Sequence, residues 1–289
     1  MLTAIVLPLS LAVMMFGVGT SLELADFKRV FIYPKAVAVG IMGQILLLPL
    51  LGYVFATQFG LPPELAVGVM VIVACAGGAT SNMIVYLARG DVALSITLTA
   101  INSVITVITI PLVVNYALNH FMGASVETEL PVGITSIKLF VITLVPVITG
   151  MLVRYYFSSF AIRIEKPMNK LVTVLFVMIV IGVFYEARGP LVDYIASVGP
   201  VTYFLNLSAM ILGFAVAWLF RLSEQQSSTV SIEVGIQNSA TGIFVASTLL
   251  SNPEIAIVPV IYALAMNINI GLFLLVRHWY SPKGVLATR

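Results

Sequence analysis

The chain has 289 residues, of which 60% are hydrophobic and 9% charged, and its formal net charge is +2. Soluble domains carry about 25% charged residues, so this composition excludes a soluble fold and predicts an integral membrane protein. The small net charge gives no indication of nucleic acid binding, and the single cysteine, Cys75, excludes an internal disulfide framework.

Hydropathy, interrupted by glycine, proline and charged residues, predicts nine membrane-spanning helices. In chain order, their approximate bounds are 2–21, 34–57, 64–88, 91–118, 135–157, 168–186, 201–220, 227–250 and 254–277. The apolar runs are long and do not alternate, so spanning β-strands are not expected. No basic stretch precedes the first segment, so we expect a membrane span there rather than a cleavable signal peptide.

Lysine and arginine gather on one side of this predicted membrane. With nine spans, the connections on that side and the C-terminus hold twelve of these residues: Lys28, Arg29, Lys35, Arg89, Arg154, Arg163, Lys166, Lys170, Arg221, Arg277, Lys283 and Arg289. The other side holds only Lys138 and Arg188, together with Glu127 and Glu129. Because cytoplasmic loops are enriched in basic residues, we expect a multi-pass protein of the cell's inner (plasma) membrane. Its N-terminus would lie outside and its C-terminus in the cytoplasm.

Two predicted spans contain glycine and small polar residues near their centres. The third span holds ACAGGATSN (74–82), and the eighth holds SIEVGIQNSATG (231–242). Glycine weakens a helix interior by about 1 kcal/mol relative to alanine. Backbone groups freed within a membrane must face protein, water or an ion. For Gly77 and Gly78 taken alone, close helix packing through small residues accounts for the pattern equally well.

The two interrupted spans occupy corresponding places in the chain. Each is followed by a short turn and a long span, and 91–94 (DVAL) aligns with 254–257 (EIAI) at a shift of 163 residues. The turn after the third span is predicted inside, whereas the turn after the eighth is predicted outside. Interrupted helices in two halves of opposite orientation indicate a secondary transporter with its site near the membrane midplane. The first half is then one helix short.

Glu233 is an acidic residue inside an apolar span, where a charge costs about 2.5–3.5 kcal/mol. No lysine or arginine within the spans can pair with it, but oxygen-bearing amides occur at Gln44, Asn82, Gln237 and Asn238. A carboxylate among neutral oxygens is a site for a hard cation such as Na⁺. A glutamate that is protonated, or that extends to the membrane surface, is the structural alternative.

Other polar residues in the spans are weaker candidates. Ser95 and Thr99 lie four apart on one helix face, with Asn102 close to the same face. Such hydroxyls commonly bond to their own helix, and a lone glutamine in a span is often a contact between helices. Asn267 and Asn269 are candidates for lining a polar cavity. The sequence has no HExxH, GxSxG or P-loop motif, so neither an enzyme nor an ATP-driven pump is expected.

The motifs GGATSN, LARGDVALS followed by Thr99, and EVGIQNS, together with MMFGVGTSLELADF and Gln44, resemble the bile acid:sodium symporter family. The resemblance covers essentially the whole chain and includes bacterial homologues of the apical sodium-dependent bile acid transporter. It implies an all-α membrane fold with nine helices, the family's first being absent, arranged as a panel and a core domain. Two broken helices, 64–88 and 227–250, would cross in the core. The implied ranges are 1–33 (panel), 34–120 (core), 134–190 (panel), 200–278 (core) and 279–289 (cytoplasmic tail).

The same resemblance implies two sodium sites that share one carboxylate. The first would use Ser81, Asn82, Ser95, Thr99 and Glu233. The second would use Gln44, Glu233 and Gln237, with the main-chain oxygens of Val234 and Ile236. Substrate would lie against Ala79, Thr80, Asn238, Ser239 and Asn267. The order GGATS in place of the family's GGTAS, and Asn267 in place of a histidine found in some bacterial members, both fall beside the substrate.

We therefore predict a sodium-coupled symporter of an organic anion, working by alternating access. The anion would be bile-acid-like or a small carboxylate such as pantoate, and two Na⁺ ions would accompany it, with no other metal. A proton-coupled or uncoupled carrier, with Glu233 as the titrating group, is the alternative within transporters. A non-transporting membrane sensor is the alternative outside them. The expected partners are the anion, sodium and the lipid bilayer, and the oligomeric state is open.

Overall fold

A computed structural model gives the fold of residues 5–123, 130–187 and 191–280. The predicted acidic loop with Glu127 and Glu129 lies outside these described residues, as do 281–289 of the predicted tail. Within the described residues the regular elements are helices, and one isolated backbone bridge joins Ala76 to Gln237. The predicted all-α fold is thereby confirmed.

The helices follow the predicted order, and several continue directly into a wider π-helical turn. Their bounds are α1 Leu7–Gly19, α2 Leu24–Lys28, α3 Pro34–Met42, α4 Leu48–Gln58, α5 Pro63–Ala74, α6 Ala79–Leu87, α7 Val92–Ala117, α8 Val132–Leu139, α9 Val145–Tyr156, α10 Ser158–Ala187, α11 Leu191–Leu219, α12 Glu224–Gly235, α13 Ser239–Phe244 and α14 Pro253–Tyr280. The π turns are η3 Gly43–Leu47, η4 Leu118–Met122, η5 Phe140–Leu144 and η6 Val245–Leu249, and a 3-10 turn η2 spans Arg29–Phe31.

Six helices of the described chain are long and apolar enough to cross a membrane. They span Pro34–Gln58, Val92–Met122, Val132–Tyr156, Ser158–Tyr185, Val192–Leu219 and Pro253–His278. A seventh span forms if the pair Leu7–Gly19 and Leu24–Phe31, bent by 72°, is counted as one. Two shorter apolar helices, Pro63–Ala74 and Ser239–Leu249, belong to the two interrupted segments. These helices make the chain a multi-pass membrane protein, while the count of nine spans stays a prediction.

Two helices begin about ten residues earlier than the sequence predicts. Helix α10 begins at Ser158 rather than near 168, and α11 begins at Leu191 rather than near 201. Helix α10 contains Pro167 and α11 contains Pro200, and in the sequence each proline indicates the start of a span. Both helices continue through these prolines, and the charged turns of α10 remain exposed to solvent. Membrane hydropathy marks the apolar part of a helix and misses a polar extension of the same helix.

Both glycine-rich segments are broken helices. Helix α5 ends at Ala74 and α6 begins at Ala79, whereas α12 ends at Gly235 and α13 begins at Ser239. Asn238 caps α13, since its Oδ1 accepts from the Thr241 amide at 3.0 Å. Each break leaves a short stretch of extended backbone in the middle of a buried segment. The chain therefore places main-chain polar groups where a continuous helix would have hidden them.

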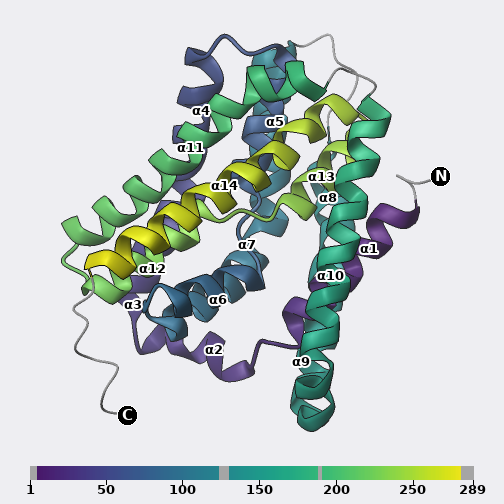
Figure 1. The fold of residues 1–289 in the computed structure, drawn as a ribbon. Helices are drawn as coiled ribbons and strands as arrows, with labels where there is room; N and C mark the ends of the chain where they lie inside the picture. The colour runs from purple at the N-terminus through teal and green to yellow at the C-terminus, as the bar shows by residue number, and fades with distance from the viewer. Residues whose placement is uncertain (1–4, 124–129, 188–190, 281–289) are drawn as a thin grey trace.

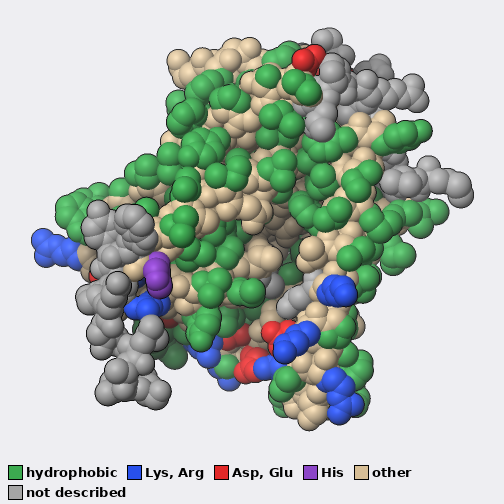
Figure 2. All heavy atoms as spheres, viewed as in Figure 1, with side chains coloured by type: hydrophobic (Ala, Val, Ile, Leu, Met, Phe, Trp, Pro, Cys, Tyr) green, Lys and Arg blue, Asp and Glu red, His purple; other side chains and the backbone are tan. Residues whose placement is uncertain are grey.

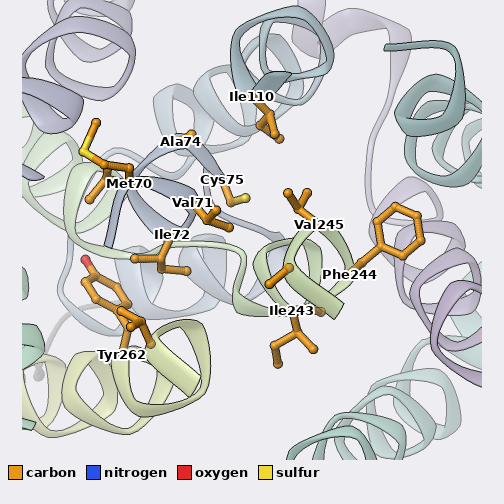
Figure 3. Close-up of a cluster of buried hydrophobic side chains, with 14 of the residues drawn as sticks. Met70, Val71, Ile72, Ala74, Cys75, Ile110, Ile243, Phe244, Val245 and Tyr262 are labelled. Carbon is orange, nitrogen blue, oxygen red and sulfur yellow. The ribbon is translucent and has the colours of Figure 1, made fainter. Parts of the chain in front are cut away.

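The helices form two groups in space. Helix α1 packs against α9 and α10 along one side of the molecule, and these are seen on the right in Figure 1. Helices α3 to α7, α11, α12 and α14 make up most of the other side, and α2 links the two groups at the lower end (Figure 1). Figure 2 shows apolar side chains over the middle and top of this face, and lysine and arginine towards its lower end. Buried apolar side chains of α5 and α13 meet between the groups (Figure 3).

Candidate functional site

The two helix breaks, 75–78 and 236–238, contact each other through their main chains. Ala76 and Gln237 form an antiparallel bridge, and the Asn238 amide donates to the Cys75 carbonyl over 2.8 Å. A Cβ atom at Gly77 would lie 2.8 Å from the Ile236 carbonyl oxygen, a distance that real Cβ atoms do not reach. Glycine is therefore required at this position for the two segments to approach. The crossing explains why glycine and small polar residues interrupt both spans.

Five oxygen-bearing side chains from three helices converge beside the crossing. On α7, Ser95 Oγ donates to Glu233 Oε1 at 2.6 Å, and Thr99 Oγ1 donates to Glu233 Oε2 at 3.2 Å. From α6, Asn82 Oδ1 lies 2.8 Å from Ser95 Oγ, and Ser81 Oγ lies 3.4 Å from Thr99 Oγ1. All five residues that the resemblance assigns to a first sodium site therefore lie in one cluster.

This cluster combines one carboxylate with neutral oxygens. Glu233 is 3% exposed, and Ser81, Ser95 and Thr99 are at most 1% exposed. In the part of the chain that the structure describes, no three His, Cys, Asp or Glu side chains come together as they do in zinc sites. A hydroxyl that donates to the carboxylate keeps its lone pairs for a cation. The donor set fits a hard ion of low charge, such as Na⁺, that prefers oxygen ligands.

A second cluster is built around Gln237, four residues after Glu233 in the chain. Gln44 Nε2 donates to Gln237 Oε1 at 2.9 Å, and Gln237 Nε2 donates back to Gln44 Oε1 at 3.2 Å. Gln237 Nε2 also donates to the Val234 carbonyl at 2.9 Å. Gln44 stands in the π turn η3, ahead of Pro49, whose missing amide hydrogen disfavours a regular turn. The structure thus brings together Gln44, Gln237 and Val234, with the Ile236 carbonyl facing Gly77.

A pocket opens next to the crossing, between the two groups of helices. Its polar side chains are all neutral: Ser103, Thr106, Thr143, Asn238 and Thr241. Its apolar wall is formed by Met15, Cys75, Ala76, Val107, Ile110, Leu139, Leu144 and Val147. Asn238, the residue that follows Gln237 in the chain, faces this pocket, so cluster and pocket share one backbone segment. The cavity is small, about 20 Å³, and combines neutral polar groups with apolar side chains.

The remaining predicted substrate residues lie in different surroundings. Ala79 is the first residue of α6, and Thr80, next to it, is exposed. Ser239 is buried at the start of α13, and Asn267 is exposed on α14, where its Nδ2 bonds to Ala263 of its own helix at 2.6 Å. Thr80, Ser239 and Asn267 do not line the pocket described above.

Sequence reasoning did not single out four of the residues that line the pocket: Ser103, Thr106, Thr143 and Thr241. Thr106 continues the face of α7 that carries Ser95, Thr99 and Asn102, so extending that face by one turn would have found it. Thr143 gives no such signal, because it is an isolated hydroxyl in an apolar span, and its Oγ1 bonds to Leu139 of the same helix at 2.6 Å.

Comparison with known proteins gives a consistent family. The sequence pattern of the family described as "Sodium Bile acid symporter family" matches residues 8–194 of this chain. An uncharacterized sodium-dependent transporter of Bacillus subtilis is 29% identical over 90% of this chain and 78% of its own length. Human sodium/bile acid cotransporter 4 is 29% identical over 95% of this chain and 63% of its own length. A rat sodium-dependent organic anion transporter is 30% identical over 78% of this chain and 60% of its own length.

The chain spans between 58% and 63% of the length of the plant and mammalian relatives that it matches. These relatives are transporters rather than enzymes, and their descriptions share a dependence on sodium. The match to the family covers well over half of the chain and includes the first broken helix. The sequence similarity and the apolar helices lead to one conclusion: this chain belongs to the sodium bile acid symporter family.

Proposed function

We propose that the chain is a sodium-coupled symporter of a small organic anion that works by alternating access. The observation that carries this proposal is the enclosure of Glu233 by oxygen side chains from two other helices, at the crossing of two broken helices. A buried carboxylate without a basic partner is costly, and a bound cation removes that cost. Sodium is the coupling ion that the family's descriptions name for its members.

Two sodium ions would share the Glu233 carboxylate. The first would take the hydroxyls of Ser81, Ser95 and Thr99, and the amide oxygen of Asn82. The second would lie at the Gln44–Gln237 pair and use the carbonyls of Val234 and Ile236 exposed by the broken helix. Its arrival requires the two amides to turn their oxygens towards it, since each now donates to the other. This rearrangement links ion binding to the backbone at Gln237.

Substrate would bind beside the crossing, at this pocket, which must widen to admit it. A carboxylate would be met there by the hydroxyls of Ser103, Thr106, Thr143 and Thr241 and by the Asn238 amide. The pocket has no lysine or arginine among its lining residues, and apolar side chains form most of its wall. These properties favour a small monocarboxylate, such as pantoate, over a large anion with several charges.

Coupling follows from the position of the shared segment. Gln237 belongs to the ion cluster and Asn238 to the pocket, so ions that fix this segment also prepare the pocket. Sodium and substrate must then raise each other's affinity by the same factor. Alternating access would come from movement between the group containing α1, α9 and α10 (panel) and the group containing the crossing (core). The basic lower end in Figure 2 supports a cytoplasmic orientation for that end.

The test is uptake into proteoliposomes of radiolabelled pantoate and, separately, of a bile acid, with an inward gradient of sodium or of potassium. We expect sodium-driven uptake by the wild-type protein and none by Glu233→Ala, although the variant still inserts. Sodium-driven uptake by Glu233→Ala at the wild-type rate would overturn the site. A pH gradient that drives uptake without sodium would favour the proton-coupled alternative, and saturable binding without flux would favour the sensor.

A further inference from the structure

The carbonyl of Gly235 is the last main-chain acceptor of α12 and has lost its partner to the break. In a continuous helix it would accept from the amide of Ser239, but that amide bonds to the Gln237 carbonyl at 3.1 Å. A buried carbonyl without a donor is strongly disfavoured. Gly235 lies two residues after Glu233 and two before Gln237, so its placement affects both ion clusters.

Two side chains from neighbouring helices supply the missing donors. The Tyr262 hydroxyl, from α14, donates to the Gly235 carbonyl at 2.8 Å. Asn206 Nδ2, from α11, donates to the same carbonyl at 2.7 Å and to the Tyr262 oxygen at 3.1 Å. Both residues are 0% exposed. Figure 3 shows the Tyr262 ring beside Ile72, with its oxygen at the end directed away from α14.

A third residue fixes the orientation of this pair. Asn269 Nδ2 donates to Asn206 Oδ1 at 2.9 Å and to the Tyr203 carbonyl at 3.0 Å. Asn206 therefore has its oxygen occupied as an acceptor, and only its amide hydrogens face Gly235. Helix α11 lies close to the end of α12, since a Cβ atom at Gly235 would lie 2.4 Å from Met210 Cγ and 3.7 Å from Asn206 Nδ2. The end of α12 is held from α11 and α14 together.

We propose that Tyr262 and Asn206 are positioning residues for the sodium sites. They hold the Gly235 carbonyl and so keep the end of α12 open, with Glu233 turned towards Ser95 and the Val234 carbonyl turned towards Gln237. The hydrogen bonds of these two side chains go to Gly235, to each other and to Asn269, and not to the side chains of the clusters. This inference rests on the proposed function, because it assigns the pair a role in sodium affinity at the same site.

The experiment measures binding of radioactive sodium to the purified full-length protein at constant ionic strength, with potassium as the replacing ion. Tyr262→Phe keeps the ring and removes only the hydroxyl. We expect it to raise the half-saturating sodium concentration about fivefold, the factor that one neutral hydrogen bond contributes. Asn206→Ala removes the other donor and serves as a second variant, with the same expected shift, if the first fails to fold. The melting temperature in potassium reports general stability.

Thr202→Val is the matched control, because it removes a fully buried hydroxyl of α11 that bonds only to Val198 and Gly199 of the same helix. A sodium midpoint raised in Tyr262→Phe and unchanged in Thr202→Val supports the proposal. Equal midpoints in wild type and Tyr262→Phe, or equal shifts in both variants, overturn it. Glu233→Gln is measured in parallel, and wild-type sodium binding by that variant would instead overturn the proposed site.

Discussion

Replacing Ser95 by alanine tests the first ion cluster with the smallest change. Ser95 is 0% exposed, and its hydroxyl lies 2.6 Å from Glu233 Oε1 and 2.8 Å from Asn82 Oδ1. A hydrogen bond to a charged group contributes about 1.5–3 kcal/mol. The substitution also removes part of this free energy from the ion-free protein, and that part does not change sodium affinity. We therefore take the lower end of the range, about 1.5 kcal/mol, for the loss of sodium-binding free energy. Since about 1.4 kcal/mol corresponds to tenfold, the half-saturating sodium concentration should rise about tenfold.

The assay is thermal unfolding of the purified protein as sodium replaces potassium, because a bound ion raises the melting temperature by mass action. Thr97→Val is the control, since the Thr97 hydroxyl is also fully buried on α7 but bonds to Asp26 and Ala93 rather than to the cluster. Ser95→Ala should shift the sodium titration, and Thr97→Val should leave its midpoint in place. Coinciding midpoints for these two variants would refute the reasoning.

Three further predictions concern the crossing, the second cluster and the pocket. Gly77→Ala should abolish sodium-dependent stabilisation, because its Cβ would lie 2.8 Å from the Ile236 carbonyl; a normal sodium titration would contradict the crossing geometry. Gln44→Leu leaves the Gln237 amide without one partner, which should lower the free energy of unfolding by about 1–3 kcal/mol. In thermal unfolding, the double variant Gln44→Leu/Gln237→Leu should recover part of that stability. If the effects of the two single substitutions simply add, the Gln44–Gln237 pair is refuted. Thr143→Leu should reduce anion binding at saturating sodium and preserve the sodium titration; unchanged anion binding would place the substrate elsewhere.

Much of the polar clustering around Glu233 could be predicted, because polar side chains inside a membrane span are costly unless other polar groups satisfy them. Glu233, Gln237 and Gln44 stand out against apolar neighbours, and glycines mark the breaks. The pocket could not be predicted in the same way. Thr106 and Thr143 bond to their own helices, to Asn102 at 2.8 Å and to Leu139 at 2.6 Å, as hydroxyls in membrane helices do without any further role.

The positioning pair shows a second limit of sequence reasoning. Asn269 was a candidate for a polar cavity, but its amide bonds to Asn206 and Tyr203 inside the helix packing. Its neighbour Asn267, two residues earlier, is exposed. Residues two apart point to different sides of a helix, and only the arrangement of α11, α12 and α14 decides which side faces the broken helix.

Anion binding measured in sodium and in potassium tests the central claim most directly. The purified protein would be titrated with pantoate, with other small monocarboxylates and with a bile acid, and the melting temperature followed in each salt at equal ionic strength. A sodium-coupled symporter predicts a compound that stabilises the protein in sodium and does so far less in potassium, because the two ligands share the segment at Gln237 and Asn238. Equal stabilisation by that compound in both salts would contradict coupling between the ion clusters and the pocket.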